Sequence, residues 1–261
     1  MGFSLFNPLY ALSGLFVGFV VGLTGVGGGS LMTPILVLLF GVHPMTAVGT
    51  DLLYASVTKA VGTAVHRVGD TIDWRVACFL ATGSIPATAL TLFLLQRFGL
   101  ESGNGLVMAI LGAVLVVTSL AVMRRRWIIT NAAHVLRSNV SPRRTRILTI
   151  AVGAVLGALV AATSVGAGAI GVTALILLYP ELSTARIVGT DIAHAVPLTL
   201  VAGLGHWLLG SVDALLIASL LLGSIPGVVV GGLLAPRVPE VILRPILAAV
   251  LAVVGIRLLL R

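Results

Sequence analysis

Four ionisable side chains lie in stretches of sequence that are otherwise apolar. Lys59, the only lysine, and Asp51 lie in TDLLYASVTKAVGTAVH, while Asp191 and His194 lie in GTDIAHAV. A charged group is costly in hydrocarbon, so such residues usually have a partner or a task. Lys59 is therefore a candidate counter-charge for an anion, and the alternatives are snorkelling or a buried ion pair with Asp51, about two helical turns earlier.

Asp51 and Asp191 each follow a threonine, Thr50 and Thr190, within the repeated sequence VGTD. One interpretation is helix capping, because carboxylates favour helix starts. The other is that they line a transport pathway or carry a proton, with His194 one turn after Asp191 as a candidate relay. Two equivalent aspartates could also share a proton in an intramembrane aspartyl protease, whose signature would be cleavage of a membrane substrate.

Glycines and hydroxyl residues interrupt two long apolar segments, in VGLTGVGGGSLMTP at 21–34 and in SVGAGA at 164–169. Glycine permits unusual backbone conformations, and helix starts present unpaired N–H groups with positive partial charge. Two matching breaks inside a membrane therefore indicate a shared anion site, and the alternative is close helix packing. The candidate substrate-binding residues are Thr24, Gly25, Gly27, Gly28, Gly29, Ser30, Lys59, Ser164, Gly166 and Gly168.

His66 and His206 end the second apolar run of each half, and Asp73 and Asp213 follow them at positions typical of helix N-caps. We interpret the histidines as interfacial anchors, with His66 also a candidate gate residue. A single histidine pair is a weak metal motif, so we expect no metal and no cofactor. The candidate coupling or gating residues are Thr50, Asp51, His66, Thr190, Asp191 and His194.

Composition places the chain in a membrane. Of its 261 residues 58% are hydrophobic and 9% charged, and the mean hydropathy is +1.17, so we predict an all-α polytopic membrane protein. The net charge of +8 does not indicate nucleic-acid binding, because seven of the sixteen basic residues fall in 124–146. By the positive-inside rule this segment is a cytoplasmic loop beside anionic lipid.

The sequences before and after this basic loop contain the same short motifs at the same spacing. VGTD occurs at 48–51 and 188–191, and GSIP at 83–86 and 223–226, an offset of 140 in both cases. We therefore predict one transporter domain over 1–261, built from a first repeat at 8–123, the loop at 124–146 and a second repeat at 147–260.

Each repeat contains a Gly-broken segment followed by three apolar runs. The segment 147–180 has 34 residues without a charge, about 51 Å as a straight helix, which is too long for one crossing of roughly 30 Å. We predict two helical pieces that meet at the glycines. If the pieces return to the side from which they came, each half crosses an odd number of times and the repeats are inverted, which we favour over parallel repeats.

The order of motifs, with GVGGGS, VGTD, HRVGDTIDW and GSIP in the first half and SVGAGA, VGTD, HWLLGSVDA and GSIP in the second, resembles the TauE/SafE sulfite exporter family of membrane transporters. The resemblance covers essentially the whole chain. It implies a non-enzymatic transporter in the cytoplasmic membrane of a prokaryote that exports small sulfur-containing anions such as sulfite and organosulfonates. The chain departs from many relatives in having Asp51 and Asp191 where they have serine, and Thr199 stands opposite Lys59 in the second repeat.

We therefore expect a secondary transporter of a small anion, with protons as a second candidate cargo. A passive anion channel is the nearest alternative, and a membrane adaptor whose arginine loop binds a partner is a more distant one. The sequence leaves the coupling ion, the direction of transport and the oligomeric state open, with a homodimer as one candidate.

Overall fold

The computed structural model describes residues 8–24, 29–68, 70–98, 105–124, 141–166, 168–234 and 240–260. These residues form ten α-helices and no strand, which confirms the predicted all-α fold. The helices are α1 Pro8–Thr24, α2 Gly29–Leu38, α3 Pro44–Val68, α4 Trp74–Arg97, α5 Gly105–Met123, α7 Pro142–Thr163, α8 Ala169–Leu178, α9 Thr184–Leu208, α10 Ala214–Leu234 and α11 Glu240–Leu259.

Four described helices are long and apolar enough to cross a membrane: Trp74–Arg97, Pro142–Thr163, Thr184–Leu208 and Ala214–Gly231. Side-chain caps fix several helix starts. Asp73 accepts hydrogen bonds from the backbone N–H groups of Arg75 and Val76 at the start of α4, and Asp213 accepts one from Leu216 in α10. The predicted N-cap role of both aspartates is confirmed.

Each Gly-broken segment forms two helices that fold back on each other. At the open end of the α1–α2 pair, the rings of Tyr10 and Phe40 stack edge to face with centroids 4.7 Å apart. At the open end of the α7–α8 pair, the Thr149 and Tyr179 hydroxyls are hydrogen-bonded at 2.8 Å. The second helix of each pair therefore returns toward the end where the first began.

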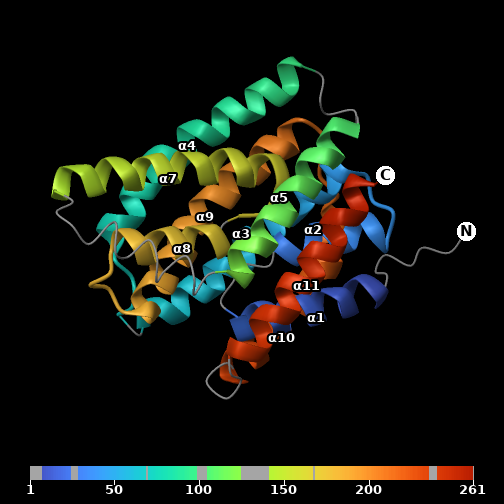
Figure 1. The fold of residues 1–261 in the computed structure, drawn as a ribbon. Helices are drawn as coiled ribbons and strands as arrows, with labels where there is room; N and C mark the ends of the chain where they lie inside the picture. The colour runs from blue at the N-terminus through green and yellow to red at the C-terminus, as the bar shows by residue number, and fades with distance from the viewer. Residues whose placement is uncertain are drawn as a thin grey trace, which may run out of the picture.

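Helices of one half pack on helices of the other. α1 packs on α10, and α7 packs on α4, as Figure 1 shows for α4 and α7. Glycines bring both pairs into backbone contact: a Cβ at Gly14 would meet Leu220, and one at Gly153 would meet Leu80. Small residues allow this approach between membrane helices.

The α1–α10 and α4–α7 pairs are parallel. Moving one turn along both helices of a pair preserves the contact, since Gly18 faces Ser224 and Gly157 faces Ser84. The parallel direction also places the N-termini of α4 and α7 at the same end of the molecule.

The helices that correspond between the repeats, α3 with α9 and α5 with α11, run antiparallel. In the first pair, Gly62 faces Ile192 whereas Gly203 faces Leu53. In the second pair, Gly112 faces Gly255, and Ser119 donates a hydrogen bond of 2.7 Å to the Ala248 carbonyl. Equivalent helices that point in opposite directions are what inverted repeats require, and we infer that the two halves cross the membrane in opposite senses.

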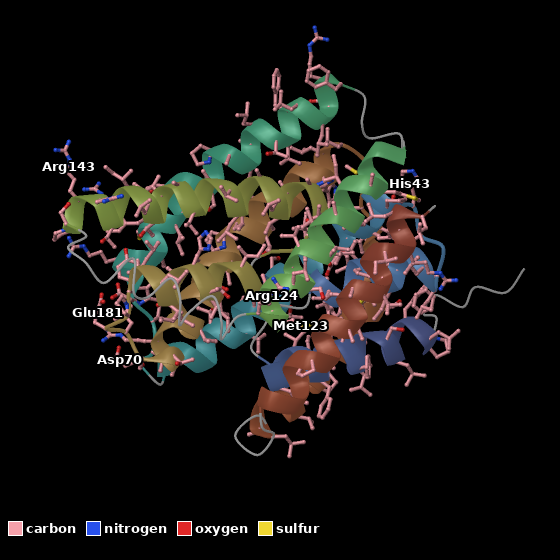
Figure 2. The ribbon with its side chains drawn as sticks, in the orientation of Figure 1. His43, Asp70, Met123, Arg124, Arg143 and Glu181 are labelled. Atoms are coloured by element: carbon pink, nitrogen blue, oxygen red, sulfur yellow. The ribbon has the colours of Figure 1, made fainter. Side chains whose placement is uncertain are left out.

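Cysteine labelling tests this topology. His43 directly precedes α3 and Glu181 precedes α9 at nearly the same place in the repeat; both are exposed and lie at opposite ends of the molecule (Figure 2). In a Cys78→Ser background, we expect a membrane-impermeant thiol reagent applied to intact cells to label only one of His43→Cys and Glu181→Cys. The other should react only after permeabilisation. Labelling of both from the same side would contradict inversion.

Candidate functional site

The ionisable residues that interrupt the apolar runs gather where α3 crosses α9. Asp51 is 0% exposed, Lys59 6%, Asp191 1% and His194 1%. Asp51 and Asp191 are each the eighth residue of a 25-residue helix, α3 and α9 respectively. Both are therefore helix-interior residues, and the capping interpretation is wrong for them because a cap lies at the helix end.

Asp51 joins the two Gly-broken hairpins. Its Oδ2 accepts hydrogen bonds from the Thr33 hydroxyl at 2.6 Å, the Thr33 backbone N–H at 3.3 Å and the Ser164 hydroxyl at 2.9 Å. Thr33 belongs to α2, and Ser164 is the residue that ends α7. One carboxylate oxygen thus binds donors from both repeats.

Asp191 lies against the start of the other short helix, α8. Its carboxylate interacts with the backbone N–H of Gly168, the N-cap residue of α8. A Cβ at Gly171 would collide with Asp191 Oδ1, so only glycine leaves room for the carboxylate there. Gly171 was not singled out in the sequence because it lies beyond the break.

Lys59 lies within electrostatic reach of both carboxylates. A buried ion pair with Asp51 was one of the alternatives for Lys59, but it leaves out Asp191 of the other repeat, which also interacts electrostatically with the lysine. No hydrogen bond joins the two aspartates among the described residues, unlike the arrangement of a proton-sharing protease dyad. The arrangement is one buried cation flanked by two carboxylates.

His194 bonds to a different helix from the one expected. Its Nε2 is hydrogen-bonded to the Ser84 hydroxyl of α4 at 2.9 Å rather than to Asp191. At the equivalent place in the other half, Tyr54 faces Ser224 of α10, although these two hydroxyls do not reach hydrogen-bond geometry. Both serines belong to the repeated GSIP motif, whose recurrence is the sequence signal that could have singled them out.

Thr50 and Thr190 form reciprocal contacts between the halves. The Thr190 hydroxyl accepts from the Asp73 backbone N–H at 2.8 Å, and the Thr50 hydroxyl accepts from the Asp213 N–H at 3.1 Å. Each threonine of a VGTD motif thus holds the start of a helix in the opposite repeat, α4 or α10. The two threonines, which the sequence suggested as gating residues, therefore hold helix starts in place.

The tip of the second hairpin has the irregular backbone expected from its glycines. Ser164 has φ 59°, Gly166 has φ 123° and Gly168 has φ 102°. In the first hairpin, Thr24 ends α1 and Gly29 and Ser30 begin α2. Gly25, Gly27 and Gly28 lie outside the described residues, and His66 lies in α3 with its side chain outside the description.

His206 is not an interfacial anchor. It is 0% exposed, and its Nε2 is hydrogen-bonded to the Ala161 carbonyl of α7 at 2.8 Å. The interfacial interpretation is wrong because His206 precedes the end of α9 by two residues and faces the adjoining helix. In the part of the chain that is described, no three His, Cys, Asp or Glu side chains gather as a metal site would require.

Comparison with known proteins agrees with this membrane architecture. A family model described as "Sulfite exporter TauE/SafE" matches residues 10–258. The chain belongs to the TauE/SafE family. It is 41% identical over 213 residues to "Probable membrane transporter protein YjnA" of Bacillus subtilis, covering 80% of this chain and 83% of that protein.

More distant TauE/SafE relatives carry similar descriptions. "Probable membrane transporter protein YdhB" of Bacillus subtilis is 27% identical over 78% of this chain and 80% of its own length. A "Probable membrane transporter protein" of Xylella fastidiosa is 29% identical over 69% of this chain and 66% of its own length. No solved structure matches the chain. The protein is therefore a membrane transporter by family.

The reciprocal threonine contacts predict a stability effect. Thr50→Val and Thr190→Val keep the side-chain shape but leave the Asp213 or Asp73 N–H without its acceptor, a loss of about 1–3 kcal/mol each. We expect each variant to lower the thermal unfolding midpoint in detergent while the substrate KM stays unchanged. Thr82→Val, which removes an exposed hydroxyl bonded within its own helix, is the control. A raised KM without lost stability would instead place these threonines in the pathway.

Proposed function

We propose that this TauE/SafE protein is a secondary transporter of small anions in the cytoplasmic membrane, and that it exports sulfite or organosulfonates. The observation that carries the proposal is the buried Lys59, which interacts electrostatically with Asp51 and Asp191, the two carboxylates that bind the Ser164 hydroxyl and the Gly168 backbone N–H at the break between α7 and α8. A buried ionisable group in a membrane helix is costly unless it serves binding or transport. The description of the family as sulfite exporters supports the substrate class.

The groups around Lys59 suit an oxyanion. Ser164 and Thr33 supply hydroxyl donors, and the start of α8 presents the positive end of its dipole, where the Gly168 backbone N–H already interacts with the Asp191 carboxylate. Half-helix N-termini directed at an anionic substrate are a common arrangement in transporters built from repeats. These donors could bind the oxygen atoms of a sulfite or sulfonate.

The charge distribution supports one orientation. Arg75 starts α4, and Arg143, Arg144 and Arg146 start α7; all four are exposed, and the parallel packing of these helices brings them to one end. Arg75 and Arg146 both lie over the Phe79 ring, at 5.7 Å and 4.9 Å from its centroid. We assign this end to the cytoplasm, where anionic headgroups attract basic residues.

Export is the direction in which an inside-negative membrane potential drives any substrate that crosses with net negative charge. An inside-negative potential drives anions outward by about 2.3 kcal/mol per charge per 100 mV. A passive anion channel would use the same driving force. Saturable flux that moves an anion against its own gradient separates a coupled transporter from a channel.

Uptake into proteoliposomes tests the anion site. We expect purified wild-type protein to take up labelled sulfite, sulfoacetate or methanesulfonate saturably, with faster uptake of a net negative charge under an inside-positive potential. Lys59→Ala should lower the flux by about tenfold or more, because losing one charge-assisted contact costs about 1.5–3 kcal/mol. Lys59→Arg should retain part of it.

Arg143→Ala, which removes an exposed cation from the end of α7, is the matched control and should transport normally. Equal flux in Lys59→Ala and wild type would remove Lys59 from the site. Absence of flux for all three anions in folded protein would contradict the proposed function.

A further inference from the structure

The donors that suit a substrate anion are bound to the chain's own carboxylate. Asp51 Oδ2 receives two hydroxyl bonds, from Thr33 at 2.6 Å and from Ser164 at 2.9 Å. It also receives the backbone N–H of Thr33 at 3.3 Å. Three donors converging on one oxygen are what an oxyanion site provides to its ligand.

The same cluster holds unpartnered acceptors. Asp51 Oδ1 and Asp191 Oδ1 are buried and receive no hydrogen bond from the residues that the structure describes. Two carboxylates interact electrostatically with a single lysine, so the cluster carries one negative charge in excess when all three groups are ionised. A buried excess charge is costly, and a second anion arriving beside it would cost more.

We propose that the Asp51 carboxylate is a tethered anion that occupies the substrate site, and that a substrate anion replaces it only when Asp51 takes up a proton. This inference rests on the proposed function, since it concerns the same anion site. The proton keeps the charge of the cluster constant: one negative charge leaves Asp51 as the substrate brings another. Thr33 and Ser164 then donate to the substrate, and Lys59 remains the counter-charge.

The proton balance of the cycle follows. On one side of the membrane the substrate enters and a proton from the same aqueous phase binds an Asp51 oxygen. On the other side the substrate leaves, the proton returns to water, and the Asp51 carboxylate recovers its hydrogen bonds from Thr33 and Ser164. One proton therefore travels with each anion in the same direction, so a dianion crosses with one net negative charge, on which the membrane potential acts, and a monoanion crosses without net charge.

Other groups around Asp51 set the electrostatic background for this exchange. Tyr54 and Lys59 lie on its own helix, while Asp191 and His194 face the cluster from α9. From the described parts of α2 and α7, the hydroxyls of Thr33 and Ser164 donate to Asp51, and on α10 the Ser224 hydroxyl faces Tyr54. Asp51 is the carboxylate whose oxygen binds donors of both hairpins, and this distinguishes it from Asp191.

The test follows anions and protons together. Wild-type protein and Asp51→Asn are reconstituted with an entrapped pH indicator at zero membrane potential. The probes are sulfite, sulfoacetate and methanesulfonate, the last of which stays singly charged. For wild type we expect uptake to accelerate on acidification, approaching about tenfold per pH unit where Asp51 is ionised, with a proton entering per anion. The Asp51→Asn variant has no carboxylate to protonate at this position, so it should carry the anion at a rate independent of pH and without protons.

Two further variants serve as a control and as an independent test. Asp70→Asn removes an exposed carboxylate from a site with φ 49°, which asparagine tolerates, and should behave as wild type. Ser164→Ala removes one of the donors of Asp51 while keeping the carboxylate itself, and it should raise the KM for the anion at least several-fold, also in the Asp51→Asn background. Thermal unfolding in detergent establishes which variants are folded.

The outcomes separate the two proposals. Anion flux without proton movement in wild type, or proton coupling that survives in folded Asp51→Asn, would overturn the tethered-anion inference and leave the transporter function standing. No flux of any of the three anions through folded wild-type protein would overturn both. If Asp51→Asn does not fold, the proton count of wild type still decides the coupling, and Ser164→Ala decides whether the donors of Asp51 bind the anion.

Discussion

Charged side chains and non-helical backbone are buried inside an apolar helical bundle, and the rest of this structure depends on that constraint. Asp51, Asp191 and Lys59 have almost no exposure, and each hairpin tip interrupts a helix where lipid offers no hydrogen bond. Every such group therefore needs a partner from the protein. The chain meets this need by bringing the α7–α8 tip, the α2 helix and the α3–α9 crossing to one place, so that the site and the packing of the halves are a single arrangement.

The exchange of helices between the repeats follows from the same requirement. If each half packed only on itself, Ser164 at the end of α7 would lose the Asp51 carboxylate that it binds from the first repeat. Instead α1 packs on α10 and α7 on α4, with glycines at contacts where a Cβ would meet backbone. The reciprocal bonds of Thr50 and Thr190 to the starts of α10 and α4 then fix the register of the two halves. Movement of one repeat against the other would have to work against these shared contacts.

Sequence patterns predicted the architecture better than the contacts of the site. The offset of 140 residues, the charge-free segment 147–180 and the glycines led to two broken hairpins with three helices each, because length and hydropathy set what can cross a bilayer. Hydrogen-bond partners were harder to predict, since they join residues distant in sequence. Thr33 stands in an apolar run before Pro34, and only the fold brings its hydroxyl to Asp51.

The wrong capping interpretation of the two aspartates had a related physical cause. Asp51 and Asp191 follow turn-like sequences, yet α3 and α9 begin seven residues earlier, at Pro44 and Thr184, so a capping pattern lay inside a helix. A single sequence shows where a polar residue interrupts an apolar run, whereas its direction around the helix depends on which helices pack beside it.

The two repeats differ at one charged position, because only the first repeat carries a lysine. The repeats keep an aspartate on each central helix, but Lys59 corresponds to Thr199, whose hydroxyl bonds to the Ala195 carbonyl of its own helix. Tyr54 corresponds to His194, and only the histidine bonds to its serine. The repeat thus places an equivalent aspartate on each of α3 and α9, while one lysine interacts with both of them. A second lysine would neutralise both carboxylates, and the cluster would then have no excess negative charge for a proton to balance.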